Sequence, residues 1–288
     1  MNTGNYYVHR EPLTSDVIFK AVFGQECPDS KAALIQLLNL VLNRKENPIV
    51  DLVYKNPFSI TEAENEKVII MDIKVETSNG ELIDIEMQVG NLDFYINRSV
   101  YYGCNQIVKG LEKGEDYDKM KKSIIISFVK GILFPNTRAF HSVNTLCERN
   151  TGEELTNLLQ LHYIELDKIN CRLCVKDLGP LEQFGAYMKC TGNPYETDFI
   201  ERLIQEGEKV ISMTDSVLKK VSEEEKLYHL RMSREMKEME IRVGLNANFT
   251  KGMNQKAEEI AIKMKQAKEP VEKIMDYTGL TEGEIKTL

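Results

Sequence analysis

The segment MDIKVETSNGELIDIEMQVG, residues 71–90, alternates apolar and polar residues on both sides of an SNG turn. Such alternation predicts two antiparallel strands, each with one apolar and one polar face. A three-residue loop over residues 78–80, with Gly80 in the left-handed conformation, pairs every apolar residue with an apolar one. A two-residue turn would shift the register by one and mix the faces, so the three-residue loop is expected.

The polar face of this hairpin collects acidic residues. In the predicted register Lys74 lies opposite Asp84, and Asp72 lies opposite Glu86. Directly opposed like charges repel by up to about 1 kcal/mol, unless a proton or a cation lies between them. Mg²⁺ suits the pair because it accepts one or two protein carboxylates and completes its shell with water and phosphate oxygens. The pattern therefore suggests a magnesium site for phosphodiester hydrolysis, with a merely solvated acidic face as the alternative.

Composition limits the class of protein. The chain has 288 residues, of which 42% are hydrophobic, enough for one full core with an appendage. It contains no apolar run of about 18 residues and no recognisable targeting segment, so we expect a cytoplasmic protein without membrane contact. The formal net charge of -8 argues against coating nucleic acid by bulk electrostatics. An acidic stretch at 51–100 precedes a more basic one at 101–150, which suits a metal-dependent enzyme acting on a polyanion.

The remaining patterns predict a mixed α/β sheet. Helices are expected over residues 15–23, 29–42 and 91–111, and strands over residues 49–54, 121–134 and 158–169. The chain turns polar and helical after a TGNP sequence near residue 195. We therefore expect a sheet domain over 1–195, a helical extension over 196–250, and a helix with a helix-turn-helix-like hairpin over 251–288.

Two capping-box patterns mark helix starts in the C-terminal part. Ser222 precedes Glu225 by three residues, and Thr281 precedes Glu284 in the same way. The second box follows a turn at residues 278–280 and predicts a terminal helical hairpin. Such a hairpin is more often a packing or oligomer element than a reader of DNA bases.

Several segments, in order, resemble one known family. They are LTSDVIFKAVFG (13–24), MDIKVETSNGELIDIEMQ (71–88), NRSVYYGCNQIVKGLEKGEDYDKMKKSIIISFV (97–129), LHYIEL (161–166) and the terminal YTGLTEGEIKTL. Together they are similar to the Rpn-type recombination-promoting nucleases and transposases of the PD-(D/E)XK nuclease superfamily. The resemblance implies a restriction-endonuclease-like core, in which a helix and flanking helices surround a mixed central β-sheet. It also implies DNA cleavage that depends on Mg²⁺, with Mn²⁺ as a substitute.

The resemblance assigns roles to three hairpin residues. Asp72 takes the position of the first metal-binding acid, and Glu86 takes that of the acid in the (D/E)XK motif. Gln88 stands where many superfamily members have lysine. Glutamine at this position is common in the family that the chain resembles. An amide can orient water or phosphate, but it cannot offset negative charge. Lys20, Lys74 and Arg98 are the open candidates for the missing positive charge.

Three further residues are candidates for supporting roles. Asp16, at the start of the first predicted helix, resembles an acid that family members place near the site, with N-capping by Ser15 or Asp16 as the alternative. Arg98 and Tyr102 are four residues apart, so one helix face could present both to the site or to phosphate. For Tyr102, packing in the core is the simpler explanation.

The expected function is a Mg²⁺-dependent DNA endonuclease with little sequence preference, active in recombination or mobile-element biology. DNA is the expected partner, and the C-terminal helices offer a route to homo-oligomers. The alternative is a non-catalytic nuclease fold that acts as a binding or regulatory module. The absent lysine and the negative net charge leave this alternative open, whereas the retained acids and amide speak against it. RNA is an alternative substrate.

Overall fold

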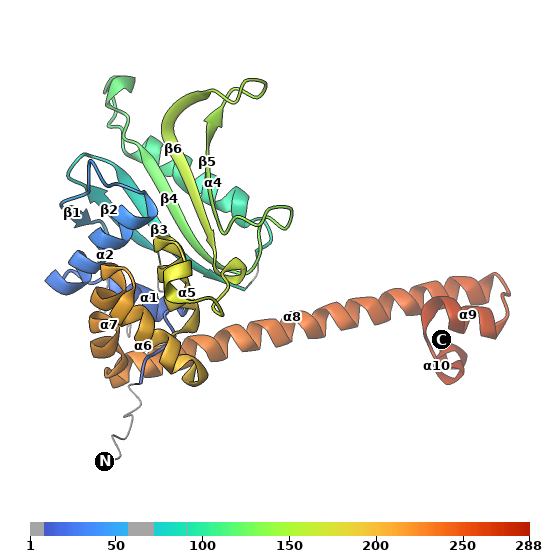
Figure 1. Cartoon of the computed structure of the whole chain (residues 1–288). Helices are drawn as coiled ribbons and strands as arrows, with labels where there is room; N and C mark the ends of the chain where they lie inside the picture. Colours follow the sequence, from blue (N-terminus) through green and yellow to red (C-terminus); the bar gives the residue numbers. More distant parts are fainter. Residues whose placement is uncertain (1–8, 57–71, 91) are drawn as a thin grey trace, which may run out of the picture. The chain divides into compact units, whose positions relative to one another are not determined.

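The computed structural model of the chain describes residues 9–56, 72–90 and 92–288, without the side chains of residues 225, 226, 238 and 240–252 (Figure 1). Its described strands form a six-stranded sheet in the order β1-β2-β3-β4-β6-β5. Neighbours β3, β4 and β6 are parallel, and the other pairs are antiparallel. The strands are β1 Leu52–Tyr54, β2 Ile73–Thr77, β3 Leu82–Val89, β4 Ser123–Lys130, β5 His141–Cys147 and β6 Glu154–Glu165.

Helices cover both faces of this sheet, which confirms the predicted α/β class. The α-helices are α1 Asp16–Phe23, α2 Pro28–Val41, α4 Tyr95–Lys109, α5 Pro180–Cys190, α6 Thr197–Glu206, α7 Lys209–Ser222, α8 Glu225–Gln266, α9 Val271–Thr278 and α10 Glu282–Thr287. Short 3-10 helices are η1 Tyr117–Lys119, η2 Leu166–Lys168, η3 Val175–Asp177 and η4 Pro194–Glu196. None of the described helices has the length and apolar character needed to cross a membrane.

The hairpin adopts the predicted register. Lys74 pairs with Asp84, and apolar Val75 and Ile73 pair with Ile83 and Ile85. The loop closes through a 2.8 Å hydrogen bond from the amide of Gly80, whose φ is 78°, to the carbonyl of Thr77. Only a residue without Cβ adopts this φ at no steric cost. Met71, the first residue of the predicted hairpin, lies outside the described residues.

The two faces of the sheet carry separate hydrophobic clusters. The larger cluster joins α1, α2, α5 and α7 to the apolar face of the hairpin, including Ile73, Ile85 and Met87. The smaller cluster lies under α4 and includes Tyr95, Ile125 and Tyr163. Because side chains alternate along a strand, the polar face of the hairpin lies on the α4 side.

Three expectations for local structure need correction. Ser222 does not cap α8, because it ends α7 and its hydroxyl donates to the carbonyl of Leu218. Ser15 precedes α1 but makes no side-chain capping bond, and Asp16 is the first residue of the helix. The strand expected over 158–169 begins earlier, at Glu154, because it pairs with β5, an edge strand that the periodicity did not reveal.

Contacts divide the chain into units Met1–Arg231 and Met232–Leu288. Helix α7 packs against α1 and α2 within the first unit. The division therefore falls later than the expected boundary at residue 195, and the expected boundary at residue 250 lies inside α8. In the second unit, α9 and α10 form the predicted hairpin around Ala261, Ile274 and Ile285, and Thr281 caps α10 together with Glu284.

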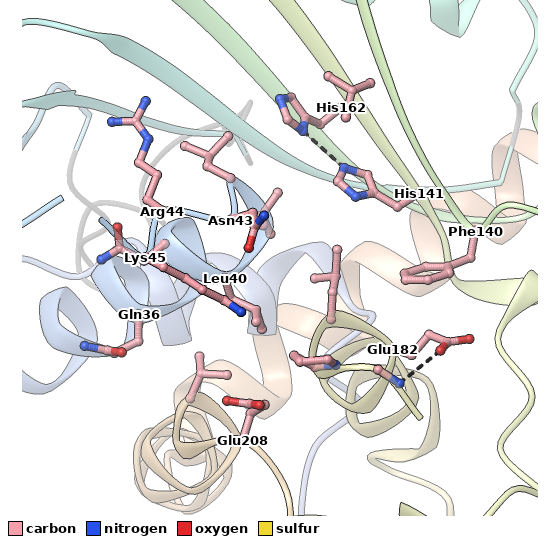
Figure 2. A pocket seen from close by; sticks show the side chains of 18 of the residues that line it. Gln36, Leu40, Asn43, Arg44, Lys45, Phe140, His141, His162, Glu182 and Glu208 are labelled. Carbon is pink, nitrogen blue, oxygen red and sulfur yellow. Dashed lines mark hydrogen bonds between the residues drawn. The ribbon is translucent and has the colours of Figure 1, made fainter. Parts of the chain in front are cut away.

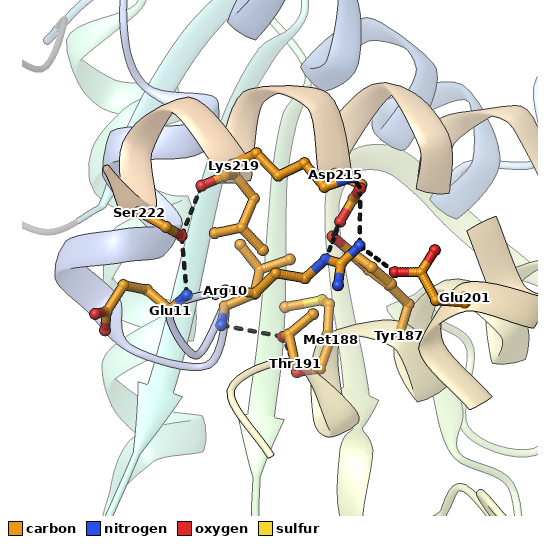
Figure 3. A network of polar contacts seen from close by, with 11 residues as sticks. Arg10, Glu11, Tyr187, Met188, Thr191, Glu201, Asp215, Lys219 and Ser222 are labelled. Atoms are coloured by element: carbon orange, nitrogen blue, oxygen red, sulfur yellow. Dashed lines mark hydrogen bonds and ion pairs between the residues drawn. The ribbon is translucent and has the colours of Figure 1, made fainter. Parts of the chain in front are cut away.

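A buried ionic network attaches the N-terminal segment to the helical layer (Figure 3). Arg10, which is 3% exposed, places Nε 2.5 Å from Asp215 Oδ1 and Nη2 2.7 Å from Glu201 Oε1. The hydroxyl of Tyr187 donates to the same Asp215 oxygen at 3.0 Å, and Lys219 lies 2.8 Å from the other. These contacts hold α5, α6 and α7 against the residues that precede α1.

Candidate active site

Five polar residues of the hairpin gather on the face that α4 covers. Asp72 directly precedes β2, Lys74 lies within it, and Asp84, Glu86 and Gln88 alternate along β3. Extending the observed register by one residue places Asp72 opposite Glu86, as predicted. The charge of Asp72 contributes to a raised pKa at both Asp84 and Glu86, behind the larger effect of burial.

Asn56 fixes the backbone beside the first acid. Its Nδ2 donates to the carbonyl of Asp72 at 3.1 Å, and its Oδ1 accepts from the amide of Lys74 at 2.7 Å. This residue bridges the end of β1 to the start of β2, so the position of Asp72 does not depend on the hairpin ladder alone. The sequence analysis did not identify Asn56, since no spacing rule connects it with the hairpin.

Lys74 forms ion pairs with two acids, Asp84 opposite it in the hairpin and the nearby Asp72. Its ammonium contacts Asp72, and Asp84 Oδ2 is 3.8 Å away. Burial lowers the pKa of Lys74, but the hydrogen bond to Asp72 and the charge of Asp84 outweigh this effect and raise it. The lysine is therefore charged at neutral pH and compensates both acids.

Asp84 is the acid whose importance the sequence analysis missed. It is 0% exposed, and neither of its carboxylate oxygens has a hydrogen-bond partner. Burial, reinforced by Asp72, raises its pKa well above the usual range. Alternation along β3 already places Asp84 on the same face as Glu86, so the sequence pattern contained this signal.

Glu86 is positioned by an aromatic hydroxyl from α4. The Tyr95 hydroxyl donates to Glu86 Oε2 at 2.9 Å, and a 2.8 Å hydrogen bond joins the same hydroxyl to Ser127 Oγ. Burial raises the pKa of Glu86, while the bond from Tyr95 and the charge of Arg98 act in the opposite direction. Tyr95 thus orients Glu86 Oε2, whereas Glu86 Oε1 takes no part in this hydrogen bond.

Arg98 lies beside the residue that replaces the motif lysine. Its Nη2 donates to Gln88 Oε1 at 2.6 Å, and its guanidinium lies 4.8 Å from the centre of the Tyr95 ring. Of the three candidate cations, Arg98 is the one in contact with Gln88. Tyr102, one turn further along α4, packs against the smaller core cluster, and the charge of Glu86 adds to burial in raising its pKa.

The two candidates from α1 approach from the other side of the sheet. Lys20 is 4% exposed, and its charge lowers the pKa of Asp84, behind burial and the charges of Asp72, Lys74 and Glu86. Asp16 begins α1, and its carboxylate accepts a hydrogen bond from the amide of Val17 at 2.7 Å.

The unpartnered acids test whether a divalent metal ion fits this site. Asp72 Oδ1 and both oxygens of Asp84 are buried without hydrogen-bond donors. Among the described residues, no group of three or more His, Cys, Asp or Glu side chains is arranged to hold a metal ion. A magnesium ion needs only one or two protein carboxylates, because water and phosphate oxygens complete its shell. Asp72 and Glu86 would supply these two carboxylates. In this structure the ammonium of Lys74 lies beside Asp72, where a metal ion would bind.

Comparison with known proteins agrees with this geometry. A family profile described as PD-(D/E)XK nuclease family transposase matches residues 13–247, which include every residue of the site. The chain belongs to this family. The mixed sheet flanked by helices is accordingly the restriction-endonuclease-like fold of PD-(D/E)XK proteins. Searches of curated proteins and of solved structures gave no significant match. Membership of the family supports a nuclease or transposase-like role for the chain.

Replacing the buried acid of this PD-(D/E)XK protein should increase its stability. We expect Asp84→Asn to raise the free energy of unfolding by about 1–2 kcal/mol in metal-free buffer, because both carboxylate oxygens are buried without a hydrogen-bond donor and the ion pair with Lys74 is long, at 3.8 Å. Urea denaturation in EDTA measures the change. Asp118→Asn, at an exposed position, serves as the control and should have no effect. Loss of stability in Asp84→Asn would show that the carboxylate is well compensated.

Proposed function

We propose that this chain hydrolyses phosphodiester bonds of DNA with a divalent metal ion, Mg²⁺ or Mn²⁺, held by Asp72 and Glu86. The observation that carries the proposal is the convergence of Asp72, Asp84 and Glu86 on one face of the hairpin, where Asp72 Oδ1 and both oxygens of Asp84 are buried without a hydrogen-bond partner. When bound, the ion would lower the pKa of a water molecule and offset charge on the scissile phosphate.

The surrounding residues divide the remaining tasks. Tyr95 holds Glu86 in place through its 2.9 Å hydrogen bond, so this carboxylate is oriented before substrate arrives. The Gln88 side chain orients the attacking water or a phosphate oxygen. Lys74 compensates Asp72 and Asp84 in this structure, and with a metal ion bound to Asp72 its charge would be free to offset that of the phosphate.

Two exposed aromatic residues of the α4 segment support nucleic acid as the substrate. Phe94 is 81% exposed and directly precedes α4 with a left-handed φ of 58°, and Tyr101, two helical turns further on, is 66% exposed. A bulky residue rarely adopts a positive φ, and this outlier is the reason to propose a role for Phe94. Aromatic rings provide stacking surfaces for bases without reading their sequence. This agrees with cleavage that has little sequence preference.

We assign the charge of the missing lysine to Arg98, because it donates directly to Gln88. Arg98→Gln should lower DNA cleavage by about 10²-fold, since a charged donor near the phosphate is removed. Adding Gln88→Lys to that variant should restore part of the activity by returning a cation to the motif position. Initial rates of plasmid nicking measure both effects. Absence of any recovery in the double variant would remove this role from Arg98.

Plasmid nicking by purified protein tests the proposed function itself. The wild type should nick supercoiled DNA in Mg²⁺ or Mn²⁺ but not in EDTA, and Asp72→Ala should be inactive under all conditions. An RNA substrate of the same sequence tests the alternative polymer. Nicking that persists in Asp72→Ala would indicate a contaminant or a different site.

One observation favours a second candidate, a non-catalytic binding or regulatory module. The ammonium of Lys74 already compensates Asp72 and Asp84, and Gln88 carries no charge. A protein of this kind would bind DNA without nicking it in any divalent metal. The nicking assay combined with a gel-shift assay therefore separates the two functions. Homo-oligomer formation through the C-terminal helices is part of the same proposal and is measured by light scattering.

A further inference from the structure

A second cavity lies on the opposite face of the sheet from the acidic site. It has a volume of about 950 Å³ and lies between the end of α2, the starts of α5 and α7, and strands β5 and β6 (Figure 2). His162 contributes to its wall from β6, where its neighbours Leu161 and Tyr163 belong to the α4 side. The cavity is therefore separated from Glu86 by the sheet itself. Its volume is within the range of small-molecule sites.

The wall formed by β5 and β6 carries an unsatisfied buried histidine. His162 is 4% exposed, and its Nδ1 lies 3.1 Å from His141 Nε2. Its other ring nitrogen, Nε2, is buried and has no hydrogen-bond partner. Buried polar atoms without a partner are uncommon in proteins and call for a water molecule or a ligand. Because the pair shares one bond, Nε2 of His162 keeps an unused hydrogen-bonding capacity in the wall of the cavity.

Three rings form a row along this wall. The His141 and His162 rings are stacked with centroids 5.3 Å apart, and the Phe140 ring lies 6.4 Å from that of His141. Burial lowers the pKa of His162 to about 3 and also lowers that of His141. Both rings are therefore neutral near pH 7. A row of neutral rings suits a flat aromatic ligand rather than an anion alone.

The rest of the lining is rich in cations. It includes Arg44, Lys45, Lys122 and Lys209. Glu81 engages two of them, with Oε1 2.6 Å from Arg44 Nη2 and 4.0 Å from Lys122 Nζ. Lys45 and Lys209 are exposed, and within the described part of the chain neither has a recorded ion pair. The positive ends of the α5 and α7 dipoles also lie here.

The acids of the cavity do not cancel these charges. The carboxylate of Glu182 accepts a hydrogen bond from the amide of Gly179 at 3.1 Å and so caps α5. Glu208 precedes α7 and is the other acid of the lining. With Glu81 included, four cations face three acids, and Lys45 and Lys209 are the two cations outside the Glu81 ion pairs. This small positive excess favours an anionic group and disfavours a metal ion at the histidines.

We propose that this cavity binds a nucleoside phosphate. The base lies against the row formed by Phe140, His141 and His162. The phosphate is held by Lys45 and its neighbouring cations, since charge-assisted bonds to phosphate are among the stronger polar contacts. A free inorganic anion would leave the aromatic wall and most of the volume unused. The site is independent of the proposed nuclease activity.

Calorimetric titration of the full-length chain with ADP in EDTA tests this site. Saturable binding is expected, with weaker binding of adenosine and of inorganic phosphate, because each lacks half of the ligand. Lys45→Glu should weaken ADP binding at least about tenfold. Lys119→Glu, an exposed lysine of η1 outside the cavity, is the matched control and should bind as the wild type does. Glu86→Gln should bind equally well, which separates the cavity from the acidic site.

Nitrogen NMR of the imidazoles gives a second readout that needs no variant. The chain has only four histidines, so each ring can be assigned. ADP should shift the Nε2 resonance of His162 and leave those of His9 and His229 unchanged. The proposal is overturned if ADP does not bind, if phosphate binds as tightly, if Lys45→Glu binds normally, or if Glu86→Gln loses binding.

Discussion

Glu86→Gln is expected to lower metal-dependent DNA cleavage by about 10³-fold while leaving the fold intact. The amide keeps the size of the side chain and can still accept the hydrogen bond from Tyr95. It removes the negative charge that a divalent ion requires. Initial rates of plasmid nicking in Mg²⁺ measure the cleavage activity. The thermal midpoint of unfolding, measured on the same protein, reports whether the fold is intact.

The matched control for this variant is Glu112→Gln, on an exposed acid beyond the end of α4. It should cleave at the wild-type rate. A Glu86→Gln protein that retains more than about a tenth of wild-type cleavage would contradict the assigned role, because an essential metal ligand should cost far more. A decrease in both activity and thermal midpoint would instead report a folding defect, and Glu86→Asp would then be examined for partial activity.

Arg10→Met is expected to destabilise the protein by about 3–5 kcal/mol. The substitution leaves Asp215 buried, at 2% exposure, without its closest partner. Urea denaturation at neutral pH measures the loss. Lys220→Met, which removes an exposed ion pair with Asp29, should leave the stability almost unchanged. A loss in Arg10→Met no larger than that in Lys220→Met would mean that the network contributes little.

The same variant should show a defined pH dependence. Burial alone raises the pKa of Asp215, but hydrogen bonds from Arg10 and Lys219 outweigh it and hold the pKa below its usual range. A carboxyl group with a lowered pKa stabilises the folded state above its unfolded pKa and loses that contribution as pH falls through the folded value. The difference between wild type and Arg10→Met should therefore narrow below about pH 4.

The hairpin was the most predictable part of the fold. Its register follows from period-two alternation, and the position of Gly80 fixes the loop, so the pairing of Lys74 with Asp84 could be predicted. Helices α1, α2 and α4 also follow from their periodicity. Helix α4 was expected to begin at residue 91, which is outside the described residues. Local patterns predict these elements because each is amphipathic in its own right.

Long-range polar contacts could not be predicted. Nothing local connects Asn56 with Asp72, or Arg10 with Asp215, since these bonds depend on how distant segments pack. Position on a face was predictable for Asp84, but its complete burial was not, because burial depends on α4 and on neighbouring strands. Strand β5 escaped notice because an edge strand with a mixed pattern has no strong period.

A crystal of the protein soaked in Mn²⁺ tests the shared metal site most directly. An anomalous peak is expected about 2.1 Å from one carboxylate oxygen of Asp72 and one of Glu86. The ammonium of Lys74 should have left Asp72 in the same crystal. The result that would contradict a metal-dependent site is a fully soaked crystal with no peak between these two acids and with Lys74 still paired to Asp72.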